Sequence, residues 1–249
     1  VAVSGADPAR RADLLVELGV EELPADDVTS AIAQLRERAP SVLQDAGLGF
    51  DEVTVEGTPR RLVLAVSNVG VRETVREETV KGPPATAAYD KEGNPTRAAE
   101  GFARSNGVAV TDLTTEESGG RAYVVARRRV ESRPALELLG ESIEKLYGGL
   151  RFGRSMFWET PEVTFSRPVR WLLALWGDEL VPATVSRVCS GRVTWTPRGM
   201  DAEAVEVGSA GAYQGALERI GVVLSVDERR QQILEQSREL AASVGGTLD

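Results

Sequence analysis

The stretch Asp13-Leu-Leu-Val-Glu-Leu-Gly-Val-Glu-Glu-Leu-Pro24 sets the first strand and the first turn of the chain. Its apolar residues predict a short strand that runs to Gly19, and Pro24, which lacks a backbone N–H, stops the extended segment. Asp26 and Asp27 come next, and carboxylates suit the first turn of a helix because the helix dipole is positive there. The stretch therefore predicts a strand that leads directly into a helix.

The chain that follows alternates between hairpins and single helices. The helix after Pro24 should break or kink at Pro40. Strands are predicted at 53–56, 60–66 and 74–80, a Gly119-Gly120 hairpin leads into a strand at 122–130, and residues 150–200 are mostly strand. Helices are predicted at 97–105, 134–147, 210–220 and 226–244. Segregated hairpins and helices predict an α+β fold with antiparallel strands, rather than a doubly wound parallel sheet.

Turn signals and composition divide the chain into two or three subdomains with flanking segments. The first boundary rests on Gly82-Pro83-Pro84, which interrupts the strand pattern. The predicted segments are a linker or tail (1–12), an α+β subdomain (13–82), an α+β subdomain (83–149), an aromatic and basic β-rich subdomain (150–209), and a helical segment that leads to further carboxy-terminal domains (210–249).

Composition excludes most autonomous catalytic chemistry. The 249 residues include no histidine and one cysteine, which excludes a Ser-His-Asp triad, a Cys-His pair, a His-ligated metal and an internal disulfide. We therefore assign no catalytic residue and no metal ligand. The apolar run 171–176 is far too short to span a bilayer, so no membrane partner is predicted.

Charge is distributed unevenly along the chain. The net charge is −9, yet residues 145–200 hold 8 basic and 4 acidic side chains and all four tryptophans. Arginines interleaved with aromatic rings are typical of surfaces that bind single-stranded or looped nucleic acid. A tryptophan-rich β core with a solvated arginine rim has the same composition, and composition alone favours that second interpretation.

Six short motifs occur in a fixed order between residue 13 and about residue 244. They are the opening stretch 13–24, Thr58-Pro-Arg-Arg-Leu62, Lys81-Gly-Pro83, Asp90 to Gly93, Ala98-Ala-Glu-Gly-Phe-Ala-Arg104, and Phe165-Ser-Arg-Pro-Val-Arg-Trp171 with Gly177-Asp178. Together they resemble the amino-terminal region of the β subunit of bacterial heterotetrameric glycyl-tRNA synthetase. Each motif alone is weak, but the ordered set is specific.

Two motifs depart from the pattern of that family. Arg154-Ser-Met-Phe-Trp158 stands where the family usually has Lys-Ser-Met-Arg-Trp, so a basic side chain is replaced by Phe157. Thr196-Pro-Arg-Gly199 stands where the family has Gly-His-Arg-Phe, which keeps Arg198 but loses the histidine. Any role of that histidine therefore cannot be carried over.

The resemblance implies a part in the ATP-dependent attachment of glycine to its tRNA in the cytoplasm. In that family the α subunit carries the catalytic core that uses ATP and Mg²⁺, while the β subunit supplies tRNA binding. The implied partners are tRNA-Gly, the α subunit or a fused α domain, and the remaining β-subunit domains, with no cofactor in this fragment. We expect a fragment because the chain lacks an initiator methionine; residues 1–12 would then be a cloning tail or the linker of an α–β fused synthetase.

These expectations lead to two hypotheses for the fragment. In the first, it is a non-catalytic scaffold that contacts tRNA through arginines in or near the motifs. In the second, it is a protein docking module that organises the synthetase subunits without contacting tRNA, which the acidic flanks favour. The alternative for each arginine is an internal salt bridge, most evenly balanced for Arg167 and Arg170. The candidate tRNA-binding residues are Arg60, Arg61, Arg154, Arg167, Arg170, Arg192 and Arg198.

Overall fold

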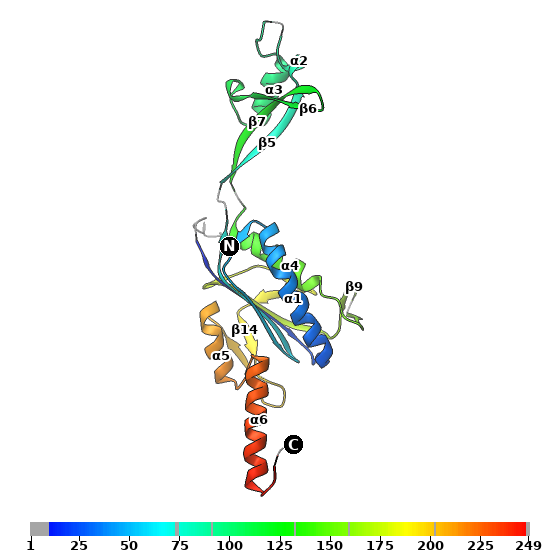
Figure 1. The fold of residues 1–249 in the computed structure, drawn as a ribbon, viewed down its shortest axis with the longest axis vertical. Coiled ribbons are helices and arrows are strands. Elements are labelled where there is room, and N and C mark those ends of the chain that lie inside the picture. Colours follow the sequence, from blue (N-terminus) through cyan, green and yellow to red (C-terminus); the bar gives the residue numbers. More distant parts are fainter. Residues whose placement is uncertain are drawn as a thin grey trace. The chain divides into compact units, whose positions relative to one another are not determined.

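The computed structural model describes residues 10–72, 75–90, 92–131, 133–158, 160–201 and 203–247. Its strand pairs are mostly antiparallel and its helices are separate from the sheets, which confirms the predicted α+β class (Figure 1). The chain divides into two compact units, one of residues 1–72 with 133–249 and the other of residues 73–132. The candidate site lies entirely in the first unit.

One mixed sheet forms the centre of the first unit. Its strands follow the order β12-β13-β10-β1-β4-β2, with β11 on β10 and β3 on β4. Only the β10–β13 pair is parallel among the pairs described. The strands are β1 (Ala12–Val20), β2 (Leu48–Gly49), β3 (Val53–Thr58), β4 (Arg61–Val71), β10 (Val169–Trp176), β11 (Glu179–Leu180), β12 (Thr184–Val185) and β13 (Val188–Gly191).

Strand β1 contributes to a separate core on each face of the sheet. Leu14, Val16 and Leu18 pack into the larger hydrophobic cluster, while Leu15 packs into a second one. Alternate residues of a strand point to opposite faces, so Glu17 shares the face of Leu15. The continuous apolar run seen in the sequence is therefore the signature of a strand covered on both sides.

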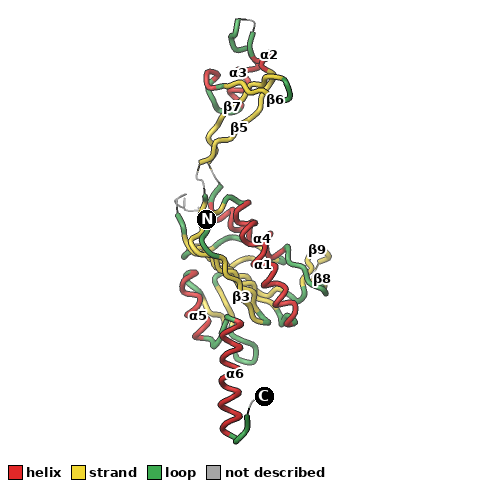
Figure 2. The backbone as a smooth tube through the Cα atoms, in the orientation of Figure 1, coloured by secondary structure: helices red, strands yellow, loops and turns green. Residues whose placement is uncertain are grey.

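Two helices cover the face of the larger cluster. They are α1 (Ala25–Asp45) and α4 (Ala135–Gly148), and Figure 2 shows both on the same side of the sheet. Helix α1 runs through Pro40 without the predicted break. Ala39, Val42 and Leu43 are buried on either side of that proline, and their packing holds the last turns in place.

Smaller elements cover the opposite face. These are α5 (Tyr213–Arg219), a 3₁₀ turn at Ala210–Ala212, and the hairpin of β14 (Val193–Trp195) with β15 (Ala204–Glu206). The first unit also contains the hairpin of β8 (Met156–Trp158) with β9 (Thr160–Phe165), and helix α6 (Val226–Ser243). None of the α6 side chains, all of which lie in the described part of the chain, is buried.

The second unit is a three-stranded antiparallel sheet with two short helices. The strand order is β5-β7-β6, with bounds β5 (Val75–Pro84), β6 (Thr114–Ser118) and β7 (Arg121–Glu131). Helices α2 (Ala85–Ala88) and α3 (Arg97–Ser105) pack against it through small side chains. Gly119 and Gly120 both have positive φ, and they form the predicted hairpin turn between β6 and β7.

The units do not follow the predicted subdomain boundaries. The boundary expected after residue 82 lies inside β5, and the change of unit falls at 72/73. A side chain at Gly82 would collide with the ring of Phe102, and the β5–β7 register shifts between Lys81 and Pro84. The Gly-Pro-Pro signal is therefore a bulge under a packed ring and not a linker.

The predicted 150–209 subdomain is also not separate, because β10 to β13 belong to the same sheet as β1 and β4.

Residues 1–9 of the predicted tail lie outside the described residues. Arg10, which was included in that tail, instead pairs with Asp178 and Glu179 and lies over the ring of Trp176. Strand β1 then starts at Ala12, so the fold begins earlier than predicted.

A candidate binding pocket above a buried carboxylate

Glu17 is a fully buried carboxylate in the middle of β1. Its Oε1 accepts hydrogen bonds from Trp171 Nε1 at 2.6 Å and from Arg61 Nε at 3.3 Å, and the Thr194 hydroxyl donates at 2.8 Å. The Tyr213 hydroxyl donates to Oε2. These donors come from β10, β4, β14 and α5, so one carboxylate joins four elements.

The bonds satisfy a charge that would otherwise be costly to bury. Arg61 supplies the compensating positive charge, and it also donates to the backbone carbonyl of Trp195. Burial, together with the nearby Glu17 carboxylate, raises the pKa of Tyr213 well above its usual value. The phenol therefore remains a hydrogen-bond donor at any physiological pH.

The indole ring of Trp171 lies over this cluster because Gly19 leaves room for it. Gly19 and Trp171 are directly paired across β1 and β10. A Cβ atom at position 19 would lie 1.9 Å from Cδ2 of the indole ring, which is far closer than a van der Waals contact. The glycine that the sequence presents as a strand end is thus required for the ring's position.

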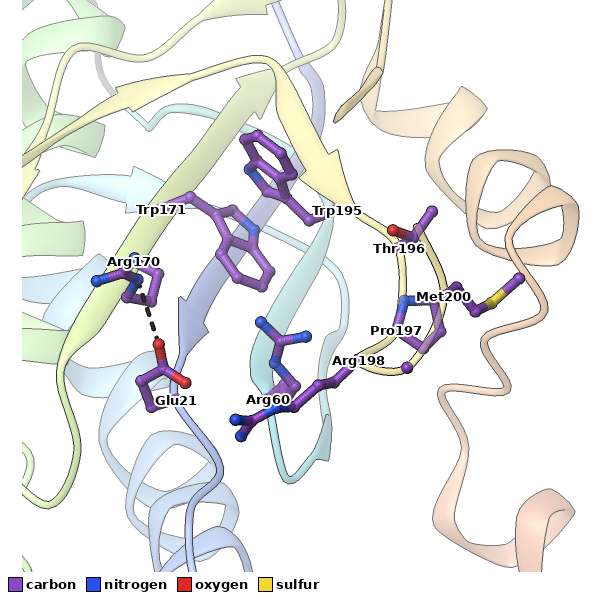
Figure 3. Close-up of a pocket in the computed structure, with 10 residues that line it drawn as sticks. Glu21, Arg60, Arg170, Trp171, Trp195, Thr196, Pro197, Arg198 and Met200 are labelled. Atoms are coloured by element: carbon purple, nitrogen blue, oxygen red, sulfur yellow. Dashed lines mark ion pairs between the residues drawn. The ribbon is translucent and has the colours of Figure 1, made fainter. Parts of the chain in front are cut away.

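A pocket of about 350 Å³ opens next to Trp171 (Figure 3). Four separate stretches of sequence meet there: the end of β1, the turn before β4, the start of β10, and the loop after β14. Three arginines and one glutamate supply all of its charged side chains. The lining residues are Glu21, Arg60, Arg170, Trp171, Trp195, Thr196, Pro197, Arg198, Gly199 and Met200.

Arg60 is the least satisfied of the three arginines. Its guanidinium lies over the Trp171 ring, 5.9 Å from the centroid, and Figure 3 shows it pointing toward that ring. Its Nε is buried and has no hydrogen-bond partner among the described residues. A buried donor without a partner carries a desolvation cost of about 1–3 kcal/mol, so Arg60 is held beside the pocket at a cost to the fold.

The other two arginines are held by long, exposed ion pairs. Arg170 Nε lies 3.4 Å from Glu21, and Arg198 Nη1 lies 3.4 Å from Glu22. The Arg198 side chain is 68% exposed. Exposed pairs of this kind contribute about 0–1 kcal/mol, so an anionic ligand could displace either carboxylate at little cost.

The structure separates the seven predicted arginines into three groups. Arg60, Arg170 and Arg198 line the pocket. Arg61 is 3% exposed and paired with Glu17, and the Arg192 guanidinium donates to the carbonyls of Asp178 and Gly208. Those last two arginines therefore serve the fold.

The remaining two, Arg154 and Arg167, line a different and wider groove at the start of α1. That groove also contains Asp26 and Asp27, and the Ser166 hydroxyl donates to Asp27. Its two positive charges face two negative ones, so the groove is less suited to a polyanion than the pocket. Arg167 and Arg170 therefore line different hollows of the first unit.

Two residues that are important for the pocket, Glu17 and Trp195, are not among the site residues predicted from the sequence. Glu17 had a usable signal, because a lone carboxylate inside an otherwise apolar strand must find buried partners. Trp195 had none, since its place at the pocket depends on the β14–β15 hairpin folding over the sheet.

Among the described residues, no group of three or more His, Cys, Asp or Glu side chains could hold a metal ion. The described helices include none that is long and apolar enough to cross a membrane.

Comparison with protein families gives a consistent result. The family model described as glycyl-tRNA synthetase beta subunit matches residues 14–249. The glycine–tRNA ligase beta subunit of Desulforudis audaxviator is 41% identical over 237 residues, which is 95% of this chain and 34% of that protein. That of Syntrophotalea carbinolica is 38% identical over 238 residues, covering 96% of this chain and 35% of the relative.

A plant relative shows the same similarity inside a longer protein. The chloroplastic/mitochondrial glycine–tRNA ligase 2 of Arabidopsis thaliana is 40% identical over 234 residues, which is 94% of this chain and 22% of that protein. The chain thus spans about a third of the length of the bacterial relatives and less of the plant one.

Proposed function

The chain belongs to the glycyl-tRNA synthetase β-subunit family, and from this premise we propose that it contacts tRNA-Gly through the pocket of Arg60, Arg170 and Arg198. The observation that carries the proposal is the convergence of three arginines beside two tryptophans on a chain whose net charge is −9. On an acidic protein, a local positive pocket selects where a polyanion can approach.

The pocket is also where the motifs that mark the resemblance come together. Glu21 comes from the opening stretch, Arg60 from Thr58–Leu62, and Arg170 from Phe165–Trp171. The Thr196–Gly199 segment forms the facing loop, and it brings Arg198. Segments far apart in the sequence thus contribute their charged side chains to one pocket. The buried hydrogen bonds of Glu17 beneath the pocket hold these segments in fixed positions relative to one another.

The proposed division of labour leaves the chemistry elsewhere. ATP and Mg²⁺ would be used by the α subunit or a fused α domain, and this region would hold tRNA for it in the cytoplasm together with the remaining β-subunit domains. In this proposal the chain is a non-catalytic part of glycine–tRNA ligase. It acts by binding and orienting the substrate RNA.

The test is a titration of the 249-residue chain with tRNA-Gly and with a non-cognate tRNA, comparing the wild type with Arg60→Gln/Arg198→Gln. Charge-assisted hydrogen bonds contribute about 1.5–3 kcal/mol each, so the double variant should bind tRNA-Gly at least about tenfold more weakly. Arg127→Gln is the matched control, because Arg127 is a similarly exposed arginine paired with Glu116 in the other unit. Equal weakening in the control, or none in the double variant, would contradict the proposal.

A second candidate function, docking of another part of the synthetase, is favoured by helix α6. Ile233 is 62% exposed and Leu240 is 69% exposed. The helix is fixed near its start, where Arg229 donates to the carbonyls of Gly57, Val223 and Leu224. A helix that exposes large apolar side chains along its length suits a protein partner better than RNA.

The two functions predict opposite results for matched variants. If docking is the only function, Ile233→Glu/Leu240→Glu should loosen association with the α subunit, and Arg60→Gln/Arg198→Gln should leave tRNA binding unchanged. If the pocket contacts tRNA, the arginine variant loses tRNA affinity and the α6 variant keeps it. Binding of each variant to tRNA-Gly and to the isolated α subunit separates the cases.

A further inference from the structure

We propose that the pocket accepts one unstacked nucleotide, with its base against Trp195 and its phosphate on Arg60, so that the ligand is a single-stranded segment of RNA and not a duplex backbone. This inference rests on the proposed function and specifies the class of ligand at that site. It follows from the size of the pocket, from the one aromatic ring that remains available, and from the mixture of charges around it.

The size of the pocket favours a single nucleotide. Its volume of about 350 Å³ is near the lower end of the roughly 300–1,000 Å³ typical of small-ligand sites. A duplex presents its phosphates along a wide, convex surface and keeps its bases stacked inside. A concave site of this size can surround a flipped-out base but cannot follow a double helix.

Of the two tryptophans, only Trp195 is free to stack on a base. The guanidinium groups of Arg60 and Arg61 already lie 5.9 and 5.7 Å from the centroid of the Trp171 ring. The Trp171 Nε1–H donates a hydrogen bond to Glu17, and the residue is only 8% exposed. Trp195 is 36% exposed and its side chain has no hydrogen bond to the described residues. Figure 3 shows its ring beside that of Trp171 on the wall of the pocket.

The facing loop offers a second apolar surface. Met200, 59% exposed, and Pro197 line the side of the pocket that Figure 3 shows across from the rings. An exposed methionine across a pocket from an exposed indole provides a second flexible, polarisable apolar surface. The Thr196 N–H donates to the Glu203 carbonyl, which joins the two ends of this loop.

The phosphate end is defined by the Arg60 guanidinium, which lines the pocket and has no hydrogen bond or ion pair to the described residues. Arg198 extends from the facing loop toward Arg60 (Figure 3). Two guanidinium groups on one phosphate form the charge-assisted, bidentate bonds for which arginine is suited. Base and phosphate would therefore occupy neighbouring walls of one pocket.

The carboxylates at the rim distinguish a nucleotide from an acidic peptide. Glu21 lines the pocket and Glu22 is paired with Arg198. They would repel a run of acidic side chains, whereas a base carries N–H donors that a carboxylate accepts. A ligand with one anionic group and one neutral, flat, donor-bearing group matches the pocket better than a polyanionic peptide.

The test measures binding of four probes to the 249-residue chain by fluorescence anisotropy or competition. The probes are a single-stranded heptaribonucleotide, an RNA duplex of the same length, inorganic phosphate, and a heptapeptide of glutamate. The single strand should bind at least about tenfold more tightly than any other probe. Equal binding of duplex and single strand, or tightest binding of the peptide, would overturn the inference.

Variants separate stacking from charge. Base–aromatic stacking contributes about 1–3 kcal/mol per base, so Trp195→Ala should weaken single-strand binding about 5- to 150-fold, and Trp195→Phe should restore much of it. Phe157→Ala is the matched control, because Phe157 is a 70% exposed aromatic on β8 that does not line the pocket. An effect of Phe157→Ala as large as that of Trp195→Ala would also overturn the stacking claim.

Failure of this inference is distinguishable from failure of the proposed function. If Arg60→Gln/Arg198→Gln weakens tRNA binding but Trp195→Ala does not, the pocket contacts tRNA through its backbone alone and the nucleotide claim is wrong. If the arginine variant leaves tRNA binding unchanged, the tRNA-contacting function itself is wrong.

Discussion

Arg60 and Arg61 are neighbours in the chain, and both lie within 6 Å of the Trp171 ring centroid, yet they belong to different regions of the molecule. Arg61 is 3% exposed and is paired with Glu17. Arg60 faces the pocket, with a buried Nε that has no partner among the described residues. Residue type and position are nearly the same, so the difference lies in the hydrogen-bond partners. A satisfied arginine stabilises the fold, and an unsatisfied one is available to a ligand.

The largest effect on stability is expected from breaking the buried ion pair of Arg61 with Glu17. Glu17→Gln removes the carboxylate that is paired with Arg61, and loss of one partner of a buried pair costs about 3–5 kcal/mol. Urea unfolding followed by circular dichroism should show that loss. Glu21→Gln is the control, because its pair with Arg170 is exposed and should contribute less than about 1 kcal/mol. Similar losses in both variants would contradict the comparison.

The second effect concerns Gly19, the glycine that leaves room for the Trp171 ring. Gly19→Ala places a methyl carbon 1.9 Å from Cδ2 of the Trp171 ring, and forced overpacking of a core costs about 1–3 kcal/mol. The shift of the ring should also weaken ligand binding at the pocket. Gly215→Ala provides the contrast, since that helical position is open and alanine should stabilise it by up to about 1 kcal/mol. A neutral Gly19→Ala would show that the ring is not fixed there.

The third prediction uses the raised pKa of Tyr213, which arises from burial and from Glu17. In the unfolded chain the phenol loses its proton near pH 10, whereas in the fold it stays protonated, so the free energy of unfolding falls as the pH rises above about 10. Tyr213→Phe should make this fall shallower by about 1.4 kcal/mol per pH unit. Unfolding curves between pH 9 and 11.5 measure the slope, and an unchanged slope would place Tyr213 outside the buried cluster.

The smallest effect on stability is expected at Arg60. Arg60→Met removes a buried donor without a described partner, and the gain from that removal offsets the lost cation–π contact with Trp171, so the free energy of unfolding should not fall by more than about 1 kcal/mol. Arg61→Met leaves Glu17 uncompensated and should cost several times more. Urea unfolding of the two variants is the measurement. Equal destabilisation would remove the distinction between the neighbours.

The sequence was sufficient for much of the fold because its signals were local. The strand at Asp13–Gly19, the Gly119-Gly120 turn and the helices at 134–147 and 226–244 depend on neighbouring residues, and all are present. Gly82-Pro83-Pro84 was misinterpreted as a boundary because a bulge under Phe102 and a linker have the same local composition. The continuity of the sheet from β1 to β10 is a non-local pairing that no short pattern specifies.

The candidate site was predictable only in part for the same reason. Motif resemblance selected Arg60, Arg170 and Arg198, which line the pocket, but it equally selected Arg61 and Arg192, which bond within the fold. Sequence cannot distinguish these cases, because the distinction depends on which carboxylate or carbonyl the fold brings within reach. Arg170 illustrates this well, since it is paired with Glu21 and also lines the pocket.

The most direct test of the account is the salt dependence of tRNA-Gly binding by the wild type, Arg60→Gln and Arg127→Gln. Each phosphate neutralised by the protein contributes about 0.7–0.9 to the slope of log affinity against log salt concentration. The account predicts that Arg60→Gln lowers the slope by about that amount, and that Arg127→Gln leaves it unchanged. A slope for Arg60→Gln equal to that of the wild type would show that Arg60 meets no phosphate, and it would contradict the central claim.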